Sequence, residues 1–156
     1  MLRLTLATLH LFAFGIGLGG IWGRARALAV HPLDRAATRR AFTADSWWGV
    51  AAVFWIVTGL WRLFGSMEKT TSYYTHNTVF LTKMGIFVVI LILELWPMTT
   101  LIRWRLADGR AREAWMPDEI AGHRISRISY IQVVLLLMML VAAVAMARGY
   151  GSETSR

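Results

Sequence analysis

Two charged side chains lie inside the most apolar stretch of the chain and are the first candidates for chemistry. Lys83 and Glu94 interrupt residues 80–102, a run made mostly of aliphatic and aromatic side chains. They stand 11 positions apart, which on an α-helix leaves them only about 20° apart around the helix axis. A charged side chain that faces lipid costs at least about 2.5 kcal/mol. We therefore expect the shared face to point into a bundle interior, a cavity or a cofactor.

A histidine stands at a matching depth in the first apolar run, residues 4–22. His10 and Lys83 each lie a few residues inside the same predicted side of the membrane, roughly 5–9 Å deep at ~1.5 Å per residue, and Arg62 closes the second run at that side. An imidazole can ligate a metal or carry a proton, so a ligand or redox role is one interpretation. Two structural alternatives stay open, because His10 could be a hydrogen-bonded packing residue and Lys83 could extend its ammonium group to the surface.

Glu94 is too deep to reach the surface, so it must be either protonated or paired with a cation. Its candidate partners are Arg24 and Arg26 after the first run and Arg103 after the third. Asp45 and Ser46 precede the second run, and one or the other is predicted to cap its helix by accepting a hydrogen bond from a backbone N–H. These side chains form a second polar level, on the opposite half of the predicted bundle.

Four apolar runs would position these side chains. Each is close to the ~20 residues that cross a hydrocarbon core of roughly 30 Å, and they are residues 4–22, 47–64, 80–102 and 130–147. Hydrophobic residues make up 56% of the 156-residue chain, which is too apolar for a soluble domain. We predict an all-α integral membrane four-helix bundle that forms a single domain. A short amphipathic helix, starting at Asp118 and Glu119, is expected to lie at the membrane surface before the last span.

Composition excludes several functions. The chain has no cysteine, which rules out disulfides, thiolate metal sites, iron–sulfur clusters and covalently attached haem. The net charge of +8 comes from arginines in short loops beside the apolar runs, so no nucleic-acid partner is expected. We find no phosphate-binding loop, nucleophile elbow or zinc-ligand spacing.

The positive residues predict the orientation in the membrane. Four spans put both termini and the middle loop on one side, and the first and third loops on the other. Because positive residues favour the cytoplasm, both termini are predicted to be outside and the two arginine-rich loops cytoplasmic. Eleven positive residues on the cytoplasmic side oppose five outside: Arg24, Arg26, Arg35, Arg39, Arg40, Arg103, Arg105, Arg110, Arg112, Arg124 and Arg127 against Arg3, Arg62, Lys69, Arg148 and Arg156.

Small residues on the first run predict a close helix contact. Gly15, Gly19 and Gly23 recur every four residues, a pattern that lets another helix approach closely. That helix could belong to the same chain or to a second copy in a homodimer. Further along, Pro97 is predicted to kink or end the third helix, and a loop is predicted at residues 108–109.

Three stretches resemble a known family. They are the run WWGVAAVFWIVTGLWRLF after Asp45, the segment EKTTSYYTHNTVFLTKMGIF and the segment LELWPMTTLIRWR. Together they are similar to a bacterial family of predicted inner-membrane proteins of unknown function, over most of the chain from His10 to Arg105. The resemblance implies a four-helix fold in the bacterial inner membrane, which contributes lipid as the surrounding partner, and it supplies no activity.

A more distant resemblance carries chemistry. The chain is similar to the membrane-bound, haem-containing protoporphyrinogen oxidases and the copper-resistance D group, which have a histidine in span one and a lysine in span three. His10, Arg26 and His31 keep the oxidase spacing, and Lys83 matches the lysine. Where those oxidases usually have a histidine, this chain has Glu94, and a carboxylate is a poor ligand for haem iron.

The resemblance implies a haem-like or quinone-like redox site on the outer half of the bundle. Haem b is the expected cofactor and His10 the candidate ligand of its iron. Lys83, Arg62 and Arg26 would bind propionates or an anionic head group, because cations hold carboxylates strongly when water is excluded.

The alternative is a non-catalytic accessory or scaffold subunit of a larger membrane complex. In that case His10, Lys83 and Glu94 merely hold the bundle together. Glu94, Asp45 and Arg24 are candidate intramembrane charges under either interpretation, with a structural or a functional role. A small transporter that uses Glu94 as a proton site is a third interpretation, for which four short spans give little room.

Overall fold

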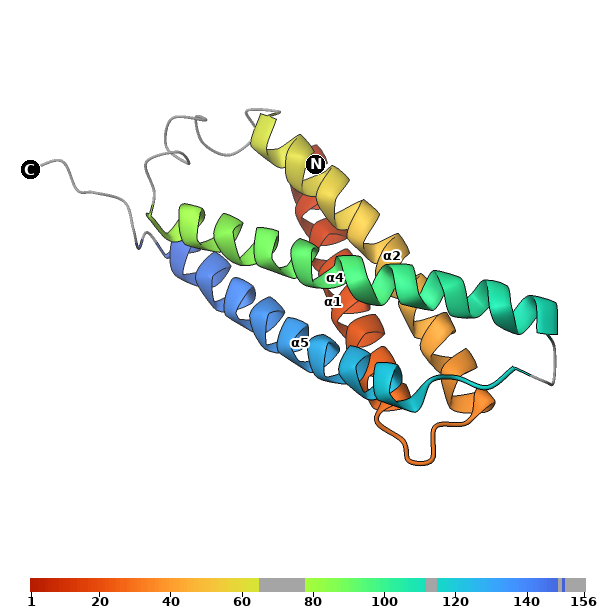
Figure 1. Cartoon of the computed structure of the whole chain (residues 1–156). Helices are drawn as coiled ribbons and strands as arrows, with labels where there is room; N and C mark the ends of the chain where they lie inside the picture. Colours follow the sequence, from red (N-terminus) through yellow and green to blue (C-terminus); the bar gives the residue numbers. More distant parts are fainter. Residues whose placement is uncertain (65–77, 112–114, 149, 151–156) are drawn as a thin grey trace, which may run out of the picture.

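The computed structural model describes residues 1–64, 78–111, 115–148 and 150, without the side chains of residues 2, 3, 62–64 and 111. These residues form no strand and four α-helices, which are α1 (Leu2–Leu28), α2 (Arg35–Phe64), α4 (Thr78–Ala111) and α5 (Glu119–Ala147). Successive helices run in opposite directions, so the start of α1 and the end of α5 lie at one end of the bundle (Figure 1). The predicted all-α class is confirmed.

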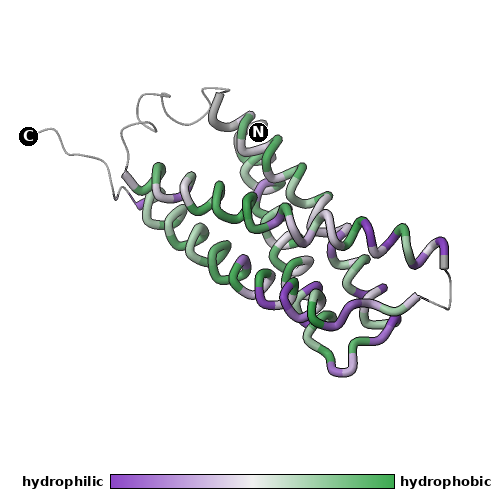
Figure 2. The backbone as a smooth tube through the Cα atoms, in the orientation of Figure 1, coloured by the Kyte–Doolittle hydropathy of each residue, from purple (hydrophilic) through white to green (hydrophobic). Residues whose placement is uncertain are grey.

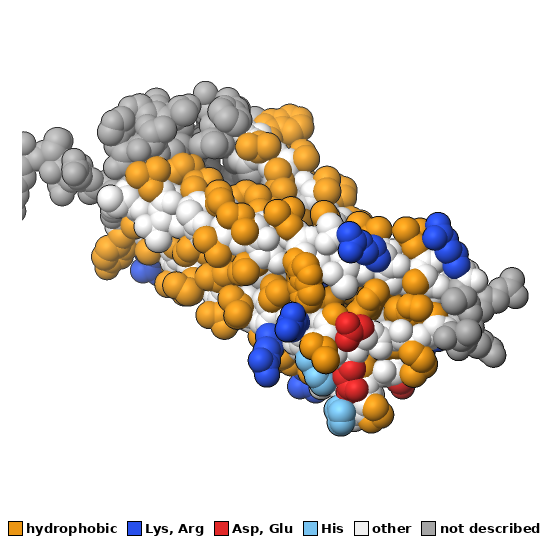
Figure 3. Space-filling model, in the orientation of Figure 1, with side chains coloured by type: hydrophobic (Ala, Val, Ile, Leu, Met, Phe, Trp, Pro, Cys, Tyr) orange, Lys and Arg blue, Asp and Glu red, His pale blue; other side chains and the backbone are white. Residues whose placement is uncertain are grey.

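Three segments of the described chain are long and apolar enough to cross a membrane: Leu4–Leu28, Thr78–Arg110 and Glu119–Ala147. They contain three of the four predicted spans. The other predicted span, residues 47–64, forms the second half of α2, whose first half is rich in charged residues. Figure 2 shows hydrophobic residues along most of each helix and hydrophilic residues gathered toward the end where α5 begins. Figure 3 shows the same separation on the surface, where acidic, basic and histidine side chains cluster near that end.

Helix α1 is the central element of the bundle. It packs against both α2 and α5, and α4 packs against α5. Buried apolar side chains form two clusters, one that includes Trp55 and Leu136 and one that includes Leu28 and Leu101. Arg24, Asp45, Glu94 and Ser129, described below, lie between the members of these two clusters along their helices.

Glycines set the distance between α1 and α2. A Cβ atom built on Gly20 would lie 2.9 Å from backbone atoms of α2, which no side chain tolerates without moving the helices apart. Gly17 faces α2 as well, and Gly23 touches it. Gly15 and Gly19 have no described atom within 4 Å of such a Cβ. The contact within the chain therefore uses Gly17, Gly20 and Gly23, three residues apart on one face. Of the predicted ridge Gly15, Gly19 and Gly23, Gly23 takes part in it and the other two do not.

The observed start of α2 shows that the predicted N-terminal cap of this helix is wrong. The helix begins at Arg35, so Asp45 and Ser46 lie inside it and do not cap it. The capping side chain is Asp34, whose Oδ1 accepts a hydrogen bond from the backbone N of Ala37 at 2.6 Å. Residues 35–44 are mostly alanine and arginine, which favour helix strongly enough to extend it beyond the apolar run.

Two more boundaries differ from the prediction. Helix α4 continues through Pro97 and through the loop predicted at residues 108–109, and it ends at Ala111. Helix α5 begins after Asp118, where the start of a helix was predicted, and the Asp118 carboxylate caps it. The prediction of a separate interfacial helix before the last span is wrong, because α5 runs without interruption to Ala147. No proline lies between residues 119 and 147 to end a helix there.

Candidate functional site

One arginine joins all four helices. Arg24 of α1 is 0% exposed, and each of its five N–H donors has an acceptor. Its Nε donates to Ser129 Oγ of α5 at 3.0 Å. Nη1 donates to Asp45 of α2 at 2.8 Å and to Glu94 of α4 at 2.6 Å. Nη2 donates to the other oxygen of Glu94 at 2.8 Å and to Gln132 of α5 at 2.9 Å.

Two further side chains complete this set. Gln132 donates from Nε2 to Glu94 Oε2 at 2.8 Å and to the backbone oxygen of Ile90 at 3.3 Å. Arg105 of α4 donates to Asp45 Oδ2 at 2.8 Å. The two guanidinium groups balance the two carboxylates, so the set carries no net formal charge. We call it the Arg24 network: Arg24, Asp45, Glu94, Arg105, Ser129 and Gln132.

The geometry of the Arg24 network is that of a structural centre. The two-pronged contact between Arg24 and Glu94 is the strongest arrangement that a guanidinium and a carboxylate can make. Every donor of Arg24 is already used, so no N–H of this residue points at a ligand. Of the three partners predicted for Glu94, the structure shows Arg24, whereas Arg26 and Arg103 are exposed.

His10 is partly buried on α1 and faces α2. Its Nδ1 lies 2.9 Å from Thr58 Oγ1, and its ring stacks on Trp55 with centroids 5.5 Å apart. The Thr58 hydroxyl lies 2.7 Å from the backbone oxygen of Phe54 and 3.2 Å from that of Trp55. Because a carbonyl oxygen only accepts, we assign the hydroxyl proton to Phe54, so that Thr58 accepts from His10 Nδ1. This assignment makes Nε2 the acceptor or ligand nitrogen of the neutral ring.

Aromatic contacts extend this site toward α4. Trp55 meets Phe87 edge-on, with ring centroids 5.7 Å apart. Lys83 lies about one helical turn before Phe87 on the same face of α4, and it is partly buried. The contacts thus connect the helix face that carries His10 to the face that carries Lys83, with Trp55 between them.

The other predicted ligands of this site lie elsewhere or outside the described residues. Arg26 is exposed on α1, 16 residues after His10, which is about 24 Å along the helix axis. It therefore does not share a site with His10. The side chain of Arg62 and residues 65–77, which hold the first half of the segment EKTTSYYTHNTVFLTKMGIF, lie outside the described residues.

A second ion cluster joins α2 to α4. Asp108 is 8% exposed, accepts from Nε of Arg39 at 3.0 Å and is also hydrogen-bonded to Nε of Arg35. This cluster was not predicted, because residues 108–109 were expected to form a loop rather than part of a helix. Its signal in the sequence was the spacing of Arg35 and Arg39, four residues apart and so on one helix face.

The polar residues of α5 that contact α1 were not predicted either. Ser126, Ser129 and Gln132 recur every three residues in an otherwise apolar helix, which puts them on one face. All three are buried, and Ser126 donates to the backbone oxygen of Ala25 at 2.8 Å. That polar stripe was the signal that α5 faces the charged part of α1.

A bundle of long apolar helices whose buried charges are paired across helices is a small integral membrane protein. A family model described as predicted membrane protein (DUF2214) matches residues 2–151, and the chain belongs to this family. The predicted membership in a membrane protein family of unknown function is confirmed. No curated protein and no solved structure matches the chain. The similarity to the haem-containing oxidases and the copper-resistance D group stays a prediction.

Proposed function

We propose that this protein holds a haem-like or quinone-like redox group on the outer half of its bundle, in a bacterial inner membrane, and that His10 is the residue that contacts it. The hydrogen bond between His10 Nδ1 and Thr58 carries the proposal. It selects the tautomer whose Nε2 can ligate a metal or accept a hydrogen bond from a hydroquinone. Histidine ligands in metalloproteins are held in this way by a partner on the other ring nitrogen.

The surroundings of His10 fit a residue that would hold haem b. Trp55 covers a face of the ring and Thr58 contacts Nδ1, and Nε2 is the nitrogen that would hold the iron. Gly59 gives the ring its space, because a Cβ there would lie 3.3 Å from His10 Cε1. A bound haem would supply one-electron chemistry, at a potential set by its axial ligand and its burial.

The remaining side chains of the proposed site have separate tasks. The ammonium group of Lys83 would hold a propionate or an anionic head group, and Trp55 and Phe87 would keep water from His10. Glu94 has no part in this site, because its carboxylate is bound by Arg24 and Gln132.

The test is an optical spectrum of the protein purified in detergent after expression with a haem precursor, together with solvent extraction and chromatography for quinones. We expect either a Soret band or one extracted quinone per chain. Thr58→Val keeps the shape of residue 58 but removes the acceptor of His10, so it should shift the band or weaken retention. A protein with neither chromophore overturns the proposal.

Histidine variants assign the ligand. His10→Ala should abolish the band or the retained quinone, whereas His31→Ala, which changes an exposed loop histidine, should leave either unchanged. Circular dichroism of both variants shows whether the helices persist. Equal loss in the two variants would show that His10 is not the contact.

A second candidate function is that of an accessory or scaffold subunit of a larger membrane complex. The small share of α4 that the other helices bury favours this function. Only 6% of the apolar window of α4 is buried, against 28% for α1 and for α5. Gly15 and Gly19 face open space on α1, so a helix of a second copy could approach there.

Mass measurement of the protein in mild detergent tests this candidate. A stable homodimer or a stoichiometric complex without a chromophore supports it. Gly19→Ile should dissociate a dimer that uses this face, whereas Gly49→Ile, at an open position on α2, serves as the matched control. A monomer without any partner rules the candidate out.

A further inference from the structure

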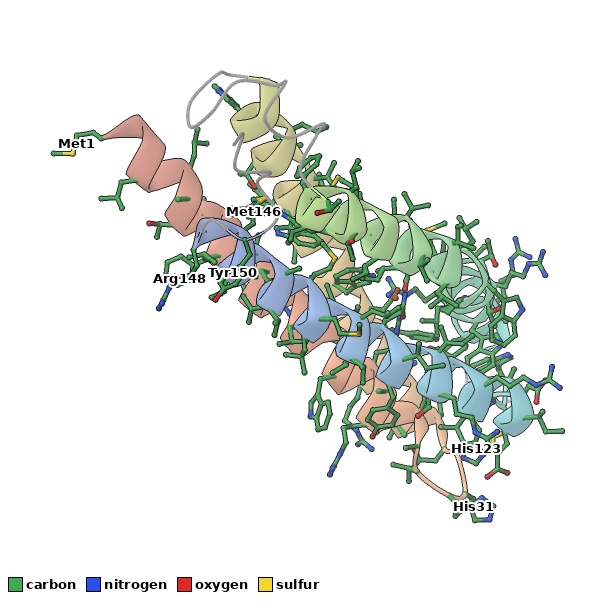
Figure 4. The ribbon with its side chains drawn as sticks, turned by 90° about the vertical axis from the view of Figure 1, so that its left-hand side faces the viewer. Met1, His31, His123, Met146, Arg148 and Tyr150 are labelled. Atoms are coloured by element: carbon green, nitrogen blue, oxygen red, sulfur yellow. The ribbon has the colours of Figure 1, made fainter. Side chains whose placement is uncertain are left out.

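Three side chains that commonly bind metals meet where the α1–α2 loop reaches the start of α5. They are His31 of the loop and Glu119 and His123 of α5, and one ligand atom from each lies within 4.8 Å of the other two. Nδ1 of His31 is hydrogen-bonded to Oε1 of Glu119, and the imidazole rings of His31 and His123 have centroids 6.2 Å apart. Figure 4 shows the two histidines together at the end of the molecule far from Met1 and Tyr150.

Two features of the fold keep these three side chains close together. Glu119 and His123 are four residues apart in the first turns of α5, so they share one face. Leu33 is 4% exposed and packs against Gly122, where a Cβ would lie 2.4 Å from Leu33 Cδ2. Because Leu33 is anchored there, His31, two residues earlier, is held over the same turn of α5.

We propose that His31, Glu119 and His123 bind one divalent first-row transition metal ion, with Zn²⁺ the best match. Two imidazoles and a carboxylate are a zinc donor set that leaves a fourth position for water. Around a tetrahedral ion at ~2.0–2.2 Å the ligand atoms stand roughly 3.3 Å apart. His31 is exposed, so its ring can turn to close the set.

The charges near the site are mixed. Asp118 and Glu119 favour a cation, whereas the exposed Arg124 beside His123 opposes one. Without metal, His31 and Glu119 would form a surface pair that contributes little to stability. With metal, the ion would fasten the α1–α2 loop to α5. This site is separate from His10, so it stands or falls independently of the proposed redox group.

Direct titration of the full chain tests the proposal, in detergent and after removal of any purification tag. Zn²⁺ should bind at one ion per chain, and Co²⁺ should give the visible absorption of a low-symmetry site. His31→Ala and His123→Ala should each weaken Zn²⁺ binding at least roughly 10–100-fold, since even the loss of an outer-shell partner costs that much.

A matched pair of carboxylate variants separates a specific site from general surface charge. Glu119→Gln removes the proposed ligand, whereas Asp118→Asn removes the neighbouring charge and keeps a capping side chain. We expect weaker Zn²⁺ binding in E119Q only. Zn²⁺ should also raise the Tm of the natural chain and not that of H123A. Unchanged Zn²⁺ binding in the H31A/H123A double variant, or no binding by the natural chain, overturns the proposal.

Discussion

Arg24 illustrates what a guanidinium requires before it can be buried among apolar helices. A charge taken out of water costs several kcal/mol, which is offset only when partners of opposite charge and complete hydrogen bonding are in place. Here the acceptors come from α2, α4 and α5. The correct placement of one residue thus depends on the packing of all three neighbouring helices.

Replacing Arg24 should therefore be strongly destabilising. Arg24→Met leaves Glu94 buried without its main cation and should lower the free energy of unfolding by about 3–5 kcal/mol. Arg24→Lys keeps the charge but cannot contact both carboxylate oxygens in parallel, so its loss should be smaller. Thermal unfolding followed by circular dichroism in detergent measures both variants.

A double variant that removes both charges is the control for the pairing of Arg24 with Glu94. In Arg24→Met with Glu94→Leu, both charges leave together, so part of the lost stability should return. A double variant whose loss equals the sum of the two single losses would contradict the pairing.

At the scale of elements, the separation of α1 and α2 depends on residues without side chains. Gly20→Ala places its Cβ against the backbone of Ala44 and Trp48, which cannot yield by rotating. We expect a loss of about 1–3 kcal/mol. Gly19→Ala meets no described atom within 4 Å, and it should be neutral or stabilising by up to about 1 kcal/mol because alanine favours helix.

Unfolding of the two glycine variants under identical detergent conditions checks this difference. Equal effects would show that helix propensity rather than the close approach decides. The Trp48 ring lies next to Gly17, so tryptophan fluorescence offers a second readout of helix separation.

The extent of each helix could be predicted from the sequence only in part. Apolar runs report the part of a helix that contacts lipid or core, so they located all four helices. They did not show that α2 extends back to Arg35, that α4 extends past Asp108, or that α5 begins at Glu119 as one helix. Asp34 and Asp118 cap the starts of α2 and α5 through local hydrogen bonds. Asp108 stabilises the extension of α4 by pairing with Arg39 of α2, a partner that is visible only in three dimensions.

For the whole molecule, the sequence predicted that buried charges meet but not the complete list of partners. Arg24 was one of three cations predicted to pair with Glu94, 70 positions away, and the structure shows that pair. The contact of Arg24 with Gln132, 108 positions away, was not predicted. Such pairings depend on which helices are neighbours, and no local pattern encodes that. The cluster of His31, Glu119 and His123 escaped prediction for the same reason.

The distribution of charge over the whole molecule predicts how it lies in the membrane. Charged side chains gather near the end where α5 begins (Figure 3), so that end should face the cytoplasm. The chain has no cysteine, which permits labelling of single introduced cysteines with a membrane-impermeant maleimide. Tyr150→Cys should react in intact cells, whereas Val30→Cys, in the α1–α2 loop, should react only after the membrane is opened. Reaction of V30C and not Y150C in intact cells would reverse the orientation and place the proposed His10 site on the cytoplasmic half.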